Sequence, residues 1–106
     1  MGMERGCFTY DIIEGSQDEY KKRHDEIWPE MLEALTEAGF SNYTLFRRGT
    51  QIVTYGEFHP NLETALSKLR TSEVFAKWDK WFGDILVNFS DENGELKTFT
   101  EVWHFK

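Results

Sequence analysis

The chain has 106 residues, which is the length of one domain and is enough to bury a modest core without disulfides or a metal ion. Its formal net charge of -7, with no basic stripe, argues against a nucleic-acid partner, and an anionic membrane surface is an equally poor partner. Aromatic residues make up 16% of the chain, more than a core of this size readily hides. We therefore expect an aromatic-lined pocket or an aromatic interface between subunits.

The single cysteine, Cys7, leaves no partner for an internal disulfide and is typical of a reducing compartment. It lies in an alternating apolar run, which favours a packed thiol over a reactive one. The sequence contains neither a signal-peptide pattern nor an apolar run with the length of a membrane span. We expect a cytoplasmic protein with one domain over residues 1–106.

The first expected element is a strand over residues 5–13, in which apolar and polar side chains alternate. Ser16 is followed three residues later by Glu19, a capping-box pattern that indicates the start of a helix. The helical pattern then runs from about residue 17 to residue 38, and Gly39 is the expected stop.

The stretch 20–28 inside this helix carries the most chemistry. Tyr20 and His24 are one turn apart and share the apolar face, so we expect both to point inward. Pro29 removes a hydrogen bond and crowds the carbonyl of Asp25, so the helix should kink, or break and restart, just after His24. The spacing alone favours a buried, hydrogen-bonded core histidine beside a tolerated kink over a functional one.

Residues 40–48 and 51–58 alternate on either side of a turn at Gly49, which predicts a β-hairpin. A short helix is expected up to Arg70, and Thr71-Ser72 should cap a further helix with aromatic residues at helical spacing.

The last part of the chain is expected to be a polar loop over residues 87–96 and a fourth strand over residues 97–105. The resulting order is the α+β, ferredoxin-like βαββαβ plan with its second helix split. Such a sheet has helices on one face, yet both faces of these strands carry apolar residues. We therefore expect a homodimer of the dimeric α/β-barrel type, in which two sheets face each other.

At this point the chain resembles the L-rhamnose mutarotase family over almost its whole length. The most specific part is the stretch 20–30, which is similar to the family's Y-x-x-R-H-x-x-I-W-P-E helix. Asn42-Tyr43 resembles the family's N-Y pair, and the stretch 74–78 resembles the segment that leads into its tryptophan site. The resemblance implies a cofactor-free dimer that interconverts the α and β anomers of a six-carbon deoxy sugar, an aldose 1-epimerase-type isomerase.

The resemblance also implies roles for individual residues. His24 falls on the catalytic proton donor of the family, and Tyr20 and Tyr43 fall on its substrate-binding tyrosines. Trp78 falls on the first of two adjacent substrate-binding tryptophans. The second of that pair is Asp79 here, which could accept a hydrogen bond from a sugar hydroxyl.

These residue types suit mutarotation, which opens a hemiacetal ring and recloses it on the other face. One group protonates the ring oxygen while another removes the proton of the anomeric hydroxyl. Histidine suits this task because its reference pKa of about 6.5 lies near working pH. The tyrosines could hold sugar hydroxyls or relay a proton, and an indole offers a flat apolar face to the C–H side of a sugar ring.

Several alternatives remain open from the sequence. The loop 88–96 lacks the N-P-D-N-S-P run of the family, so another deoxy sugar such as L-fucose is a second candidate substrate. Fold analogy adds a sugar-binding or regulatory dimer and a small cofactor-independent monooxygenase or haem-degrading protein. His59 and His104 are scattered and lack partners at ligand spacing, so we expect no metal. The resemblance implies that no cofactor is needed.

Overall fold

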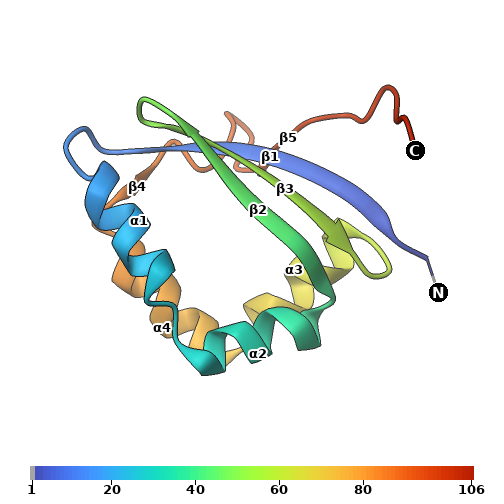
Figure 1. Cartoon of the computed structure of the whole chain (residues 1–106), viewed down its shortest axis with the longest axis horizontal. Helices are drawn as coiled ribbons and strands as arrows, with labels where there is room; N and C mark the ends of the chain where they lie inside the picture. Colours follow the sequence, from blue (N-terminus) through green and yellow to red (C-terminus); the bar gives the residue numbers. More distant parts are fainter. Residues whose placement is uncertain (1) are drawn as a thin grey trace.

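The computed structural model describes residues 2–106 and consists of an antiparallel sheet with all its helices on one face (Figure 1). The elements are β1 (Glu4–Ile12), α1 (Gln17–Asp25), α2 (Pro29–Ala38), β2 (Phe40–Arg48), β3 (Gln51–Phe58), α3 (Leu62–Arg70), α4 (Glu73–Phe82), β4 (Leu86–Val87) and β5 (Lys97–Thr98). The strand order is β2-β3-β1-β4, with β5 also paired to β1. This order confirms the predicted ferredoxin-like plan.

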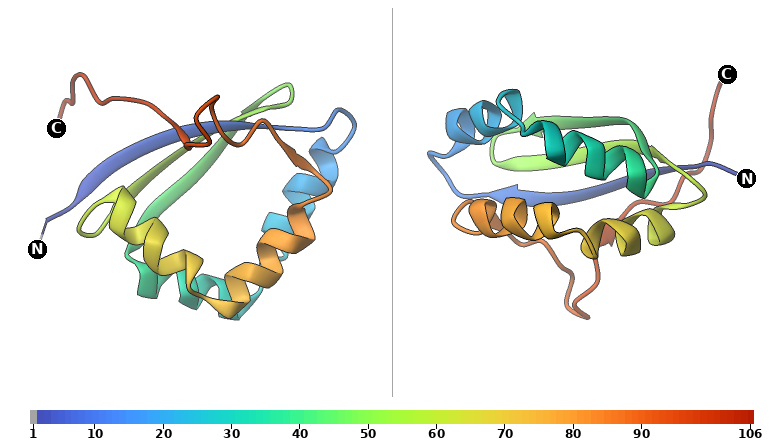
Figure 2. Two further views of the ribbon diagram at one scale, coloured as in Figure 1. Left: turned by 180° about the vertical axis from the view of Figure 1, so that it is seen from behind. Right: turned by 90° about the horizontal axis from the view of Figure 1, so that it is seen from below.

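The helices form two rows under the sheet, α1 with α2 and α4 with α3 (Figure 2). Each row is bent, so its middle lies farther from the sheet than its ends (Figure 1). The space between the sheet and the bend of each row is where the candidate site lies. No helix within residues 2–106 has the length and apolar character needed to cross a membrane.

The long helical pattern of residues 17–38 is divided into two helices, as the proline predicts. α1 ends at Asp25, and Pro29 is the first residue of α2, where its missing N–H costs nothing. The predicted capping box is wrong, because the Ser16 hydroxyl donates its hydrogen bond to the carbonyl of Ile13, 2.6 Å away. The predicted cap of the last helix is confirmed, since the Ser72 hydroxyl accepts from the N–H of Phe75 at 3.3 Å.

β2 contains an irregularity that the alternating pattern does not reveal. Its register against β3 shifts between Ser41 and Thr44, and Asn42 has a φ of 46°. This is a β-bulge, a device that re-aims side chains and is common beside active sites. Because of it, Phe40 and Tyr43 both face the helices although they are three positions apart, and their ring centroids are 5.1 Å apart.

The predicted fourth strand over residues 97–105 is mostly wrong. Within the described chain only Lys97–Thr98 of that stretch is a strand, opposite Phe8 and Thr9 of β1. β4 shares the edge position beside β1 and pairs with Asp11 and Ile12. It ends at Val87, the first residue of the predicted polar loop. Phe99 still donates its N–H to the carbonyl of Cys7 at 2.9 Å, and Arg5 of β1 pairs with Glu101 at 2.9 Å, but the end of the chain then leaves the sheet (Figure 1). Alternation predicts a strand only where a neighbouring strand is present to pair with it.

Candidate active site

An open cavity of about 1130 Å³ lies between the sheet and the two helix rows. That volume slightly exceeds the usual range for small-molecule pockets, about 300–1,000 Å³. All five candidate residues from the sequence line it, namely Tyr20, His24, Tyr43, Trp78 and Asp79. They come from α1, β2 and α4, so the fold brings together positions up to 59 residues apart, from Tyr20 to Asp79.

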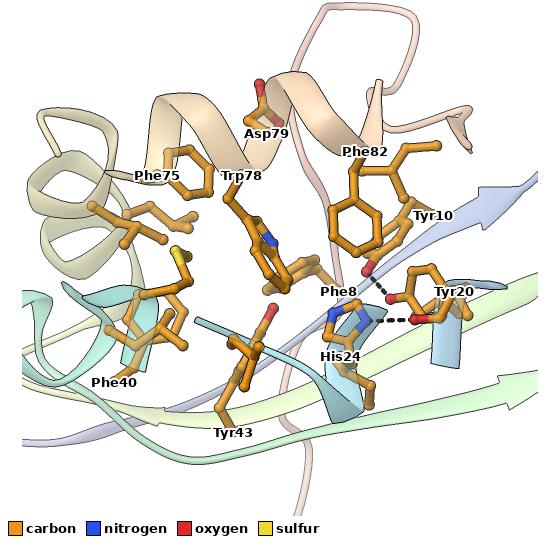
Figure 3. A pocket seen from close by; sticks show the side chains of 18 of the residues that line it. Phe8, Tyr10, Tyr20, His24, Phe40, Tyr43, Phe75, Trp78, Asp79 and Phe82 are labelled. Atoms are coloured by element: carbon orange, nitrogen blue, oxygen red, sulfur yellow. Dashed lines mark hydrogen bonds between the residues drawn. The ribbon is translucent and has the colours of Figure 1, made fainter. Parts of the chain in front are cut away.

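His24 projects from the last turn of α1 with its two ring nitrogens in different settings. Nδ1 lies 2.9 Å from the main-chain carbonyl oxygen of Tyr20. A carbonyl oxygen can only accept, so Nδ1 carries the hydrogen and the neutral ring has its lone pair on Nε2. Figure 3 shows that second nitrogen facing the space between the Tyr43 hydroxyl and the Trp78 indole.

The surroundings of this imidazole are mostly aromatic. Its ring centroid lies 4.6 Å from that of Tyr20, 5.1 Å from that of Phe82 and 5.5 Å from that of Trp78. Burial in this setting lowers the pKa of His24 below its ordinary value of about 6.5, because the charged form loses its hydration. The imidazole is therefore mainly neutral at pH 7, with a proton-accepting nitrogen turned to the cavity.

Three tyrosines present hydroxyls to the same cavity. The hydroxyls of Tyr10 and Tyr20 are hydrogen-bonded to each other, and Figure 3 shows this pair beside the imidazole. The Tyr43 hydroxyl points into the gap between His24 and Trp78 (Figure 3), where the β-bulge directs it. Burial raises the pKa of each phenol, so all three are neutral hydrogen-bonding groups near pH 7.

Trp78 and Asp79 are neighbours on α4 with opposite orientations. Trp78 is only 8% exposed, and its ring meets that of His24 nearly at a right angle, 84°. Asp79 is exposed at the edge of the cavity, and its carboxylate points to the outer side of α4, away from His24 (Figure 3). The indole is thus a wall of the cavity, while the carboxylate points away from it.

Sequence reasoning did not place Tyr10 or Phe89 in this site. The alternating pattern places Tyr10 in the expected strand 5–13, on the same face as Phe8. That shared face was the signal that could have indicated its place in the cavity. Phe89 lies in the loop expected to be polar, and its ring stacks on that of Tyr10 with centroids 4.8 Å apart and an interplanar angle of 23°. Its contact with a strand residue 79 positions earlier has no local signal in the sequence.

Comparison with known proteins agrees with the resemblance. The family model for L-rhamnose mutarotase matches residues 5–105. An L-rhamnose mutarotase of Lachnoclostridium phytofermentans is 35% identical over 102 residues, covering 96% of this chain and 98% of the relative. The chain belongs to the L-rhamnose mutarotase family. Another family member, an L-rhamnose mutarotase of Oceanobacillus iheyensis, is 34% identical over 104 residues, covering 96% of this chain and 98% of the relative.

Two solved structures show that the family fold is shared more widely. The L-rhamnose mutarotase from Formosa agariphila superposes with a TM-score of 0.79 at 23% identity, covering 97% of this chain and 99% of that one. Tetracenomycin F2 cyclase from Streptomyces glaucescens, a type-II polyketide cyclase, superposes with a TM-score of 0.71 at 16% identity and 97% coverage of both chains. At these identities the likeness concerns the fold alone, so the chemistry must be argued from the site.

Proposed function

We propose that this member of the L-rhamnose mutarotase family is itself a mutarotase, which interconverts the α and β anomers of L-rhamnose. The observation that carries the proposal is the orientation of His24. Its Nδ1–H is held by the Tyr20 carbonyl at 2.9 Å, so Nε2 is the nitrogen available to a sugar in the cavity. A neutral imidazole between a phenol and an indole wall suits proton exchange on a hydroxylated, uncharged ring.

The reaction can be written with the residues present. Nε2 of His24 takes the proton of the anomeric hydroxyl, the C1–O1 bond becomes a carbonyl, and the bond from C1 to the ring oxygen breaks. The ring oxygen keeps that electron pair and receives a proton from the imidazolium, which can reach both oxygens because they are bonded to the same carbon. After rotation about C1–C2, the reverse steps close the ring on the other face.

We assign the supporting role at the ring oxygen to Tyr43. The Tyr10 and Tyr20 hydroxyls are engaged with each other, whereas the Tyr43 hydroxyl points toward the space in front of Nε2 (Figure 3). A neutral phenol placed there donates a hydrogen bond to the developing negative charge on oxygen. Tyr20, which also lines the cavity, is assigned to binding of a sugar hydroxyl.

Two residues of α4, Trp78 and Asp79, are the ones that we expect to select the sugar. The Trp78 ring offers an apolar face to the C–H side of a sugar. Asp79 also lines the cavity, and its carboxylate, turned inward from the outer side of α4, would accept a hydrogen bond from a sugar hydroxyl. Relatives with 34–35% identity are L-rhamnose mutarotases, which supports L-rhamnose. The aspartate and the Phe89 loop are the features that favour another deoxy sugar, such as L-fucose, as a second candidate.

Saturation-transfer NMR of anomer exchange tests this proposal directly. The protein is added to L-rhamnose, L-fucose and several other reducing sugars, and the exchange rate between anomers is measured. We expect accelerated exchange of L-rhamnose, reduced about 10² to 10⁴-fold in His24→Ala, the usual contribution of a general acid or base. Sugar binding without accelerated exchange would instead identify a binding or regulatory protein.

We also propose that the protein is a homodimer in a cytoplasmic setting. The support for the dimer is a set of exposed aromatic and aliphatic side chains on the open sheet face and the C-terminal segment: Phe46 at 60%, Val102 at 91%, Trp103 at 77% and Phe105 at 80%. A monomer rarely leaves so many large apolar side chains in water. The free thiol of Cys7 would suit a reducing compartment.

A further inference from the structure

Arg23, the neighbour of His24 on α1, is a buried cation whose contacts reach α4. It is 8% exposed. Its Nη1 donates to the main-chain carbonyl oxygen of Trp81 at 2.8 Å and to Asp84 at 3.2 Å, and its Nη2 lies 3.5 Å from the other carboxylate oxygen of Asp84. Its Nε donates to Glu19 at 2.7 Å on its own helix. One guanidinium therefore joins the two helices that carry the histidine and the tryptophan of the site.

The same guanidinium is packed against aromatic rings. Its central carbon lies 4.9 Å from the ring centroid of Trp81 and 5.3 Å from that of Phe82. Phe82 is also the ring that lies 5.1 Å from the imidazole of His24. The arginine and the histidine thus contact the same side chain of α4, so a movement of one relative to α4 would displace the other.

Trp81 also contacts the segment that joins α1 to α2. The ring of Trp28, the residue before α2, stacks on that of Trp81 with centroids 5.3 Å apart and an interplanar angle of 10°. α1 has nine residues, too few to hold its place by helix propensity alone. Its position against α4 is therefore set by side chains at its end, with Arg23 and Trp28 both packed against one tryptophan.

We propose that Arg23 is a positioning residue, which fixes α1 against α4 so that Nε2 of His24 faces the cavity opposite Trp78. This rests on the proposed role of His24 in proton transfer. The arrangement uses properties that only arginine has, namely several donors in a planar fork and a face that stacks on aromatic rings. A displacement of a catalytic group by about 1 Å can reduce a rate by about 10²-fold.

A purely stabilising role fits these contacts less well. The side chains of Glu19 and Asp84 are 48% and 67% exposed, and ion pairs to such exposed carboxylates add little to stability. These contacts instead fix the orientation of the Arg23 guanidinium, because its donors must meet the carbonyl of Trp81 and the carboxylate of Asp84.

The test compares three variants of the full-length protein. Arg23→Lys keeps the charge but loses the fork, and Asp84→Asn weakens the exposed partner of Arg23 without touching the core. Lys22→Met is the matched control, because it removes a positive charge from an exposed neighbour on the same helix. We expect kcat for anomer exchange of L-rhamnose to fall about 10 to 100-fold in Arg23→Lys and less in Asp84→Asn. KM should change less than threefold, and Lys22→Met should keep the wild-type kcat.

A second readout does not depend on catalysis. NMR titration of the His24 ring protons reports how well the imidazole is shielded from water, and we expect its pKa to move up toward about 6.5 in Arg23→Lys and to stay unchanged in Lys22→Met. Wild-type kcat and an unchanged His24 titration in both Arg23→Lys and Asp84→Asn would overturn the proposal. If Arg23→Lys does not fold, Asp84→Asn alone decides. If the wild-type protein accelerates no anomer exchange, the proposed function fails, while the titration still tests the positioning role.

Discussion

The Nδ1–H of His24 donates to the main-chain carbonyl oxygen of Tyr20, one helical turn earlier and 2.9 Å away. This single contact fixes the tautomer of the neutral ring and directs Nε2 into the cavity. Tyr20 therefore has two roles. Its main-chain carbonyl orients the imidazole, and its side-chain hydroxyl forms part of the cavity wall. The acceptor is a backbone atom, so the contact survives replacement of the Tyr20 side chain as long as the helix is kept.

The pH dependence of activity follows from the burial of His24. Burial lowers its pKa, which the bond to the Tyr20 carbonyl and the charge of Asp25 on the same helix partly oppose, while α4 presents the uncharged rings of Trp78 and Phe82. The neutral imidazole starts the proposed reaction, so kcat should be constant above about pH 6.5 and fall as the pH drops through the pKa of His24.

The measurement is the anomer exchange rate from about pH 5 to 8, beside an NMR titration of the same ring. The free energy of unfolding should also fall as the pH drops from about 6.5 through the folded pKa, because the unfolded chain takes up the proton more readily. A rate that instead increases on acidification would show that the imidazolium is the resting reactive form.

Tyr43→Phe removes the hydroxyl that we assign to the ring oxygen while keeping the aromatic ring in the core. We expect kcat to fall about 10²-fold, the loss typical for one donor to a developing oxyanion, with a smaller change in KM. Tyr10→Phe is the comparison, because Tyr10 bonds only to Tyr20 among the hydrogen bonds of residues 2–106 that involve its side chain. Equal losses in both variants would contradict the assignment of Tyr43.

Asp79→Ala tests whether the carboxylate of Asp79 binds sugar. If it accepts a hydroxyl hydrogen bond, KM should increase about threefold to tenfold, since one such bond contributes roughly 0.5–1.5 kcal/mol. The protein should fold normally, because the residue is exposed. Asp79→Trp, which restores the residue type of the family pair, should shift the preference toward L-rhamnose over L-fucose. Unchanged KM values for both sugars in both variants would remove Asp79 from the site.

Trp103→Asp tests the proposed dimer. The side chain is 77% exposed in the single chain, and an aromatic residue at the centre of an interface typically contributes about 2 kcal/mol or more. The dimer dissociation constant, measured by sedimentation equilibrium, should therefore increase about 30-fold or more. Ile13→Asp, at a comparably apolar position with 44% exposure near the other end of β1, is the control and should leave it unchanged. A wild-type protein that sediments as a monomer would refute the dimer.

Gly39→Ala should destabilise the protein more than a glycine substitution in open space. Gly39 has a φ of 102°, and an added Cβ would collide with the carbonyl oxygen of His59, a backbone atom with little room to move. We expect a loss of about 2–4 kcal/mol in the free energy of unfolding, which combines backbone strain with the clash. Gly15→Ala, with a φ of 91° and nothing within 4 Å of the added carbon, should lose only about 1–2 kcal/mol. Urea denaturation of both variants measures the difference.

Local sequence patterns were sufficient to predict the elements that depend on near neighbours. The division of residues 17–38 at Pro29, the hairpin around Gly49 and the shared face of Tyr20 and His24 all follow from interactions within a few residues. The family motif added the roles of the candidate residues, and their common place in one cavity agrees with them.

Only the tertiary structure decided the features that join distant parts of the chain. The bulge that turns Tyr43 toward the helices depends on the register with β3, and the contact of Arg23 with α4 spans about 60 residues of sequence. The alternating pattern of residues 97–105 failed as a predictor for the same reason, since a strand requires continued pairing with a neighbour. Within the described residues, the pairing with β1 consists of Lys97–Thr98 and one further backbone bond from Phe99 to Cys7. Periodicity indicates which side chains share a face, whereas pairing and burial depend on what the folded chain places opposite that face.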